Sequence, residues 1–117
     1  MYQVNFSNQA MHELSKLDKR EQMQLIEPIT TLSSADLARP REPLGKLNRD
    51  GRIFYRLRVG DFRLYFETQN KNTLFCEYIL HKNTLTDFVF RTGMPVSEEQ
   101  LLEQHQSFWK YLESLKR

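Results

Sequence analysis

The segment from residue 52 to residue 67, RIFYRLRVGDFRLYFE, constrains the fold of this chain more than any other part of the sequence. Apolar and polar side chains alternate along it, which is typical of β-strands with one face on a core. The pair Gly60-Asp61 interrupts the alternation and suits a two-residue turn, because glycine readily adopts the positive φ angle required there. The segment therefore predicts a β-hairpin. Its apolar face is formed by Ile53, Tyr55, Leu57, Val59, Phe62, Leu64 and Phe66.

The other face of the hairpin carries arginine against arginine. A two-residue turn places Arg58 opposite Arg63 and Arg56 opposite Tyr65. Like charges directly across a strand pair are destabilising, and the adjoining strand positions offer no acid to offset them. One interpretation is a solvated sheet face without a ligand. The other is an exposed phosphate clamp, in which arginines bind phosphate and Tyr65 stacks on a base or donates to a phosphate oxygen.

The charge of the chain is concentrated around this hairpin. The formal net charge is only +2, but residues 39–63 hold eight cations and three acids, a local excess of five. Such asymmetry favours a polyanionic partner. The cations are Arg39, Arg41, Lys46, Arg49, Arg52, Arg56, Arg58 and Arg63, and the acids are Glu42, Asp50 and Asp61.

The N-terminal part of the sequence predicts a strand followed by two helices. Residues 2–6 alternate like a short strand, and Ser7 is a good N-cap for the first helix. Asp18 begins the second helix with a capping box that Glu21 completes. Pro28 either kinks this helix or marks its boundary.

The rest of the chain completes an α+β domain. Residues 33–50 are interpreted as a linker rich in proline and charge, and residues 73–80 as the third strand of a central sheet. We predict a mostly antiparallel four-stranded sheet with two N-terminal helices and a C-terminal helix. The chain forms one domain, with a core at 1–94 and a helical tail at 95–117.

Residues 97–116 are predicted to form one amphipathic helix that begins with a capping box of Ser97 and Gln100. Its large apolar side chains favour burial. The helix packs either on its own domain or against a second copy or another protein. Its apolar face is formed by Leu101, Leu102, Phe108, Trp109, Leu112 and Leu115.

Length and composition exclude several protein classes. A chain of 117 residues is expected to be one domain with a modest core. Its single cysteine, Cys76, is interpreted as a buried apolar residue, which excludes a disulfide framework or a cysteine metal cluster. The start lacks the apolar core of a signal peptide, and no run approaches the ~18 apolar residues of a membrane span. We therefore expect a cytoplasmic protein without membrane contact.

The third strand ends at Leu80, so we expect His81 and Lys82 near the cationic face. A lone histidine is usually structural, but beside arginines it can take and give a proton near neutral pH. His12 and His105 lie in predicted helices, and no function is assigned to them.

Three stretches, PREPLGKL, GRIFYRLRVGDFRLYFE and ILHK, resemble the RelE/ParE superfamily of bacterial toxins from toxin–antitoxin pairs. The resemblance extends over about residues 2–91. It implies a small RelE-like fold. It also implies a toxin of one of two classes, because the superfamily includes both ribosome-dependent mRNA endonucleases and gyrase inhibitors.

For the endonuclease class, the resemblance implies that Arg56, Arg58 and Arg63 clamp the scissile phosphate. The reaction needs no metal or other cofactor, because the 2′-hydroxyl attacks its own phosphate and the 5′-oxygen leaves. Glu42 matches the base and His81 the acid. The alternative for Glu42 is a loop carboxylate that pairs with a nearby arginine. The residues implied to contact RNA are Lys46, Tyr65 and Lys82.

Three departures leave the proton-transfer roles open. The RelE branch has lysines where Arg56 and Arg58 stand, and arginine does not readily act as a base at its pKa. That branch also has a C-terminal tyrosine where this chain has Phe88. The tail from about residue 95 exceeds the family pattern.

The leading hypothesis is a type II toxin that cleaves mRNA on the ribosome and inhibits translation. The alternatives are a non-enzymatic gyrase inhibitor and an RNA-binding module without catalysis. The expected partners are a cognate antitoxin, mRNA and the ribosome. The expected assembly is a dimer or a toxin–antitoxin hetero-oligomer.

Overall fold

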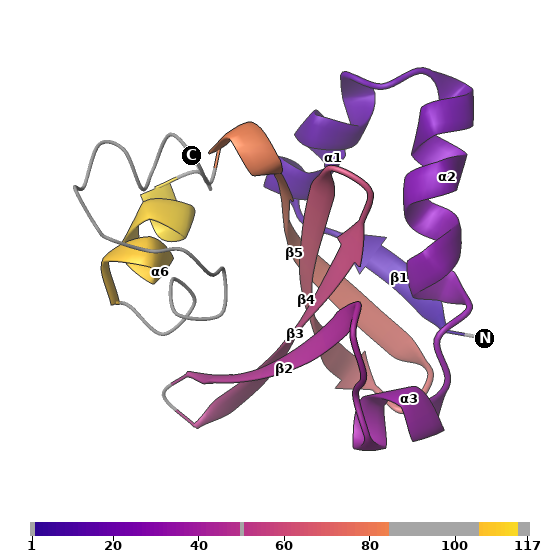
Figure 1. The fold of residues 1–117 in the computed structure, drawn as a ribbon, viewed down its shortest axis with the longest axis vertical. Coiled ribbons are helices and arrows are strands. Elements are labelled where there is room, and N and C mark those ends of the chain that lie inside the picture. The colour runs from indigo at the N-terminus through magenta and orange to yellow at the C-terminus, as the bar shows by residue number, and fades with distance from the viewer. Residues whose placement is uncertain (1, 50, 85–105, 115–117) are drawn as a thin grey trace.

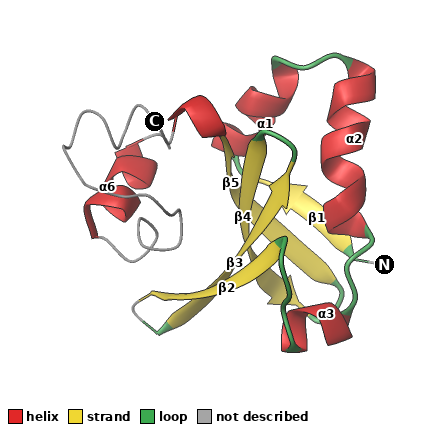
Figure 2. Cartoon of the chain, in the orientation of Figure 1, coloured by secondary structure: helices red, strands yellow, loops and turns green. Residues whose placement is uncertain are grey.

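The computed structural model describes residues 2–49, 51–84 and 106–114. In chain order, the elements are β1 (Gln3–Phe6), α1 (Asn8–Ser15), α2 (Lys19–Thr30), α3 (Ser34–Ala38), β2 (Leu44–Arg49), β3 (Arg52–Val59), β4 (Phe62–Asn70), β5 (Thr73–His81) and α6 (Gln106–Ser114). The strands form one sheet in the order β1-β5-β4-β3-β2 (Figure 2). β1 runs parallel to β5, and the other neighbours are antiparallel. The predicted α+β class is confirmed.

The first two helices begin where the sequence predicts. The Ser7 hydroxyl accepts a hydrogen bond from the Ala10 N–H at 3.1 Å. Asp18 accepts from the Glu21 N–H at 2.8 Å, and the Glu21 carboxylate accepts from the Asp18 N–H at 3.3 Å. α2 continues through Pro28. Because Pro28 lies in the last turn, its missing N–H removes one helical hydrogen bond without ending the helix.

The segment predicted as a linker, residues 33–50, contains the helix α3 and the strand β2. β2 pairs with β3, and Leu44 lies opposite Leu57. The prediction of four strands is therefore wrong by one. Leu44 is buried, but Gly45 has no side chain and Lys46 is exposed. β2 thus lacks the apolar alternation that would reveal a strand.

The hairpin of β3 and β4 has the predicted register. Val59 pairs with Phe62, and Arg58 pairs with Arg63. One residue of the predicted apolar face is not buried, because Ile53 is 45% exposed. It lies towards the end of the β2–β3 hairpin, which extends away from α1 and α2 (Figure 1).

The sheet separates two apolar clusters. We refer to the side covered by α1 and α2 as the first face and to the side covered by α6 as the second face (Figure 1). The first-face core includes Ala10, Leu14, Leu25, Ile29, Leu57, Leu64, Phe66, Cys76 and Ile79. The second-face core consists of Phe54, Tyr65, Tyr78, Leu80, Phe108, Trp109 and Leu112.

The described part of the predicted C-terminal helix packs on its own sheet. Phe108, Trp109 and Leu112 are buried, and the ring of Trp109 lies 5.3 Å from that of Phe54. For α6, packing on the same domain is therefore the correct alternative. The other parts of that prediction, residues 97–105 and Leu115, lie outside the described residues.

The described helices are short. α2 has 12 residues, and no described helix is long and apolar enough to cross a membrane. Within the same ranges, no group of three or more His, Cys, Asp or Glu side chains is placed to hold a metal ion. Cys76 is fully buried, as predicted, and burial raises the pKa of its thiol.

Candidate functional site

Three arginines lie on the second face, as the strand register requires. Arg56 and Arg58 belong to β3, and Arg63 belongs to β4 directly opposite Arg58. Arg56 is paired with Tyr65, and Arg63 is paired with Leu80 of β5. We refer to Arg56, Arg58 and Arg63 as the arginine cluster.

Glu42 relieves the repulsion within the arginine cluster, which it reaches from the connection between α3 and β2. Its carboxylate accepts a hydrogen bond from Arg58 at 2.9 Å and two from Arg56 at 3.2 and 3.4 Å. Arg56 also donates to the Pro43 carbonyl at 3.2 Å. The pairing of Glu42 with a nearby arginine, one of the two alternatives for this residue, is thus observed. Strand positions alone could not reveal it, because the acid comes from a loop.

The arginine cluster is less exposed than predicted. Arg63 donates to the backbone carbonyl of Gly60 in the β3–β4 turn at 3.1 Å and to that of Phe62, the first residue of β4, at 3.0 Å. Arg56 is 1% exposed and Arg63 is 8% exposed, so the expectation of an exposed clamp is wrong for both. The open part is the pair of Glu42 and Arg58, whose side chains are 52% and 38% exposed.

Gly45 provides the space that Arg56 occupies. The two residues lie opposite each other in the β2–β3 pairing. A Cβ atom on Gly45 would lie 2.6 Å from Nη2 and 3.0 Å from Cζ of Arg56. The guanidinium group therefore lies against the bare backbone of β2 on its way to Glu42. Our sequence reasoning missed Gly45, although a glycine within a strand often marks the close approach of another group.

Tyr65 is fully buried beneath α6. It is 0% exposed, and its ring makes edge contacts with Phe108 at 5.9 Å and Trp109 at 6.1 Å. The expectation that Tyr65 offers its ring to a base is therefore wrong in this structure. The C-terminal helix occupies the surface that the hairpin pattern assigned to a ligand.

His81 lies on the first face. It pairs with Phe62, and the two rings meet edge-on at 5.1 Å. Its Nδ1 accepts a hydrogen bond from the Asn83 N–H at 3.0 Å, so in the neutral ring the proton lies on Nε2. His81 was expected near the cationic face; the register puts Leu80 on that face and the His81 side chain on the opposite one.

The remaining predicted site residues are distributed around the sheet. Lys82 pairs with Asp61 of the β3–β4 turn at 3.3 Å. Lys46 is exposed and lies opposite Tyr55, which belongs to the first-face core. Phe88 and His105 lie outside the described residues.

The Glu42–Arg58 pair combines two chemical capacities. A carboxylate can take a proton, and a guanidinium group can donate to the oxygens of an anion. Because Arg56 is held by Glu42 and Pro43, it keeps the carboxylate in place. The arrangement can therefore bind an anion beside a general base.

The chain is similar to solved structures of toxin–antitoxin complexes. A chain of the archaeal RelE–RelB complex from Pyrococcus horikoshii OT3 matches with a TM-score of 0.54 and 22% sequence identity, over 69% of this chain and 94% of that chain. The toxin–antitoxin complex RelBE2 from Mycobacterium tuberculosis matches with a TM-score of 0.49 and 22% identity, over 68% and 96%. The RelB–RelE antitoxin–toxin complex from Methanococcus jannaschii matches with a TM-score of 0.48 and 23% identity, over 73% and 98%.

The first of these likenesses shows a small RelE-like α+β fold, which is the fold that the sequence predicted. No protein-family model and no curated protein matches this sequence.

Proposed function

We propose that this chain is the toxin of a toxin–antitoxin pair and that it cleaves RNA at the Glu42–Arg58 pair. Its fold is shared with a chain of a RelE–RelB complex. The observation that carries the proposal is the contact of the Glu42 carboxylate with Arg56 and Arg58. RNA cleavage without a metal ion requires a base next to groups that stabilise the charge on phosphate.

In the proposed reaction, Glu42 takes the proton of a ribose 2′-hydroxyl, and the 2′-oxygen attacks the adjacent phosphorus. Arg58, the most exposed arginine of the cluster, donates to the phosphate oxygens as their negative charge develops. The bond from phosphorus to the 5′-oxygen breaks, and a proton donor neutralises that oxygen. The products are a 2′,3′-cyclic phosphate and a 5′-hydroxyl.

The resemblance gives His81 as the proton donor, but the His81 ring lies on the first face against Phe62. This role therefore requires the end of β5 to bring His81 past Leu80 to the second face. His81→Gln should then slow single-turnover cleavage by roughly 10²–10⁴-fold, the usual scale for general acid catalysis. An unchanged cleavage rate in this variant would indicate Lys82 as the proton donor instead.

The resemblance to the RelE/ParE superfamily extends the proposal to the substrate and the partner. The substrate would be mRNA on the ribosome in the cytoplasm, so that cleavage inhibits translation. The partner would be a cognate antitoxin. A reading frame beside this gene that encodes a small protein with an acidic tail would support the pairing.

The test is expression of the chain in cells, followed by mapping of transcript ends. We expect new 5′-hydroxyl ends and cyclic phosphates in the wild type and neither in Arg58→Ala or Glu42→Gln. Glu27→Gln is the control, because Glu27 is an exposed carboxylate of α2. Intact transcripts in growth-inhibited cells would contradict the proposal. Tight RNA binding without cleavage would favour the alternative of an RNA-binding module without catalysis.

A second candidate is a non-enzymatic toxin that binds gyrase. It is favoured by the burial of Arg56 and Arg63, because one open arginine suits a protein contact as well as a phosphate. A supercoiling assay with purified gyrase distinguishes the two candidates. Inhibition of supercoiling together with intact transcripts would favour the second.

A further inference from the structure

The fold itself neutralises part of the local cation excess. Seven of the eight cations in residues 39–63 have described side chains. Four of them bond within the fold: Arg52 with Glu67, Arg56 and Arg58 with Glu42, and Arg63 with backbone carbonyls.

The other three, Arg39, Arg41 and Lys46, are exposed, and none of them pairs with an acid of the described residues. The exposed positive charge that has no acidic partner among the described residues therefore includes that of the α3–β2 connection and β2. Arg56 and Arg63 of the arginine cluster are buried, so they are less accessible to an outside partner.

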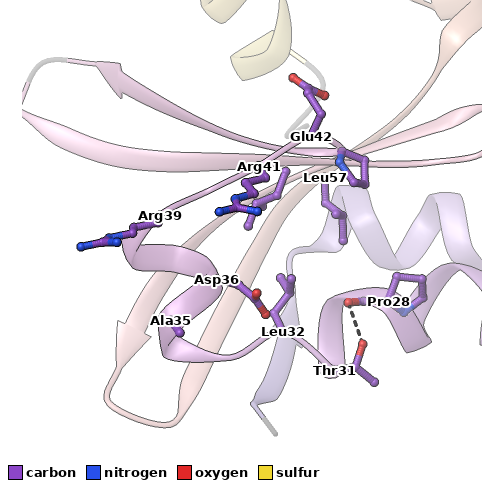
Figure 3. Close-up of a pocket in the computed structure, with 11 residues that line it drawn as sticks. Pro28, Thr31, Leu32, Ala35, Asp36, Arg39, Arg41, Glu42 and Leu57 are labelled. Atoms are coloured by element: carbon purple, nitrogen blue, oxygen red, sulfur yellow. Dashed lines mark hydrogen bonds between the residues drawn. The ribbon is translucent and has the colours of Figure 1, made fainter.

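This remaining charge lies beside an apolar pocket of about 610 Å³ between α2, α3 and the start of β2 (Figure 3). Its walls include Pro28, Leu32, Leu44 and Leu57, and Arg39 and Arg41 line the same pocket. The side chains of Arg39 and Arg41 extend in the same direction, whereas the Glu42 carboxylate points to the other side of the sheet (Figure 3).

The acids of the pocket are already engaged. Asp36 accepts hydrogen bonds from the backbone N–H and the hydroxyl of Ser33, at 2.8 and 3.0 Å, as part of the α3 capping box. Glu42 is bonded to the arginine cluster. Lys46 follows Leu44 at the next position on the same side of β2, because alternate residues of a strand share a face. It therefore extends the cationic side of the pocket along the strand.

We propose that this pocket receives an apolar side chain from an acidic segment of a partner protein, whose carboxylates pair with Arg39 and Arg41. Exposed ion pairs alone contribute little to affinity, so the apolar side chain must supply most of it. The arginines then supply orientation and a faster association. The inference rests on the proposed function only in identifying the partner as the antitoxin. It places that partner on the first face, away from the Glu42–Arg58 pair.

The test begins with a phage-displayed library of random linear peptides, selected on the intact chain. Enriched peptides are synthesised with a fluorescent label, and their binding is measured by anisotropy. Arg39→Glu with Arg41→Glu reverses the charge beside the pocket, and Ala35→Phe fills the pocket from α3. Lys19→Glu with Arg20→Glu is the control, because it makes the same charge change at the opposite end of α2. Circular dichroism verifies that each variant is folded.

We expect enriched peptides that combine acidic residues with an apolar residue. Each pocket variant should weaken their binding by roughly tenfold or more, the scale of one charge-assisted contact or one buried apolar side chain. The control should stay within about twofold of the wild type at physiological salt, because distant charges are screened.

Three results of the peptide assay would overturn the inference: no enrichment, enriched peptides without acids, or equal binding to wild type and both pocket variants. A labelled single-stranded RNA that loses binding in the same two variants would also overturn it, in favour of a nucleic-acid surface. The assay measures peptide binding without any RNA cleavage. Failure of the docking proposal is therefore distinguishable from failure of the proposed RNase activity.

Discussion

The two faces of the sheet are covered in different ways. The first face is closed by α1 and α2, which follow β1 in the chain, and its core is a continuous apolar layer. The second face is closed by α6 from the other end of the chain, and its apolar cluster shares that face with the arginine cluster. Burial of a charged group is costly unless it is paired and hydrogen-bonded, and Arg56 is both.

This difference assigns separate tasks to the faces. Apolar burial on the first face stabilises the fold. The buried charged groups of the second face stabilise it no more than well-packed apolar residues of similar volume would. In the proposed function, the arginines of the second face serve binding and chemistry. Changes on the two faces should therefore separate stability from activity.

The largest effect is expected for Glu42→Gln on the second face. If Glu42 is the base, RNA cleavage should fall by roughly 10²–10⁴-fold. The free energy of unfolding should fall by less than the activation free energy of cleavage rises, because glutamine keeps one oxygen to accept a hydrogen bond from Arg56. Single-turnover cleavage and urea denaturation of the same preparation test both parts. If activity and stability fell by equal free energies, the assignment of stability to the first face and of activity to the second face would be wrong.

On the first face, Phe66→Ala should destabilise the protein by roughly 3–5 kcal/mol, the usual cost of truncating a buried phenylalanine. Phe66 is 0% exposed. Urea denaturation measures the change, and cleavage per folded molecule should stay near the wild-type rate. Met23→Ala is the control, because Met23 is 62% exposed and should change stability by less than about 0.5 kcal/mol.

Gly45→Ala should cost about 1–3 kcal/mol, the scale of overpacking, because the new Cβ would meet the Arg56 guanidinium. The decisive comparison is a double-mutant cycle. In an Arg56→Ala background the clash is absent, so Gly45→Ala should have little further effect on stability or cleavage. An equal cost in both backgrounds would show that Gly45 does not position Arg56.

The smallest effect concerns the pH dependence of stability through Cys76. Burial raises the pKa of its thiol in the folded state, so the folded protein disfavours the thiolate. The stability contribution should be complete below the unfolded thiol pKa of about 8.5 and should fall as the pH rises towards the folded value. Urea denaturation at several alkaline pH values tests this. Cys76→Ala should lower stability near neutral pH but should remove this part of the alkaline slope, so that the difference from the wild type becomes smaller as the pH rises.

The sequence predicted those parts of the fold that depend on local patterns. Alternation and the Gly60-Asp61 turn determined the hairpin register, and side-chain caps at Ser7 and Asp18 determined where two helices begin. β2 was missed because Gly45 and Lys46 interrupt its apolar pattern. A strand at the edge of a sheet needs few apolar residues, so periodicity alone does not identify it.

The candidate site was predicted less completely, because its contacts join distant segments. The arginines were found from the register, but their bond to Glu42 depends on the path of a loop. The burial of Tyr65 depends on α6, whose apolar face was also predicted. Neither pattern indicated that the two surfaces would meet. The sequence did not predict on which side of the strand His81 lies, because that side depends on the pairing of β5 with β4.

The parallel pairing of β1 with β5 also determines the order in which the chain can fold. The side chain of Gln9 bonds to the backbone of Ile79, 70 positions away in the sequence. Contacts of such long separation form late, because closing a long loop costs more entropy than closing a short one. The hairpins of β2, β3 and β4 are local and can form early. During synthesis, the strands that carry the arginines can therefore pair before the first face is complete, and the stable domain must wait until β5 has left the ribosome.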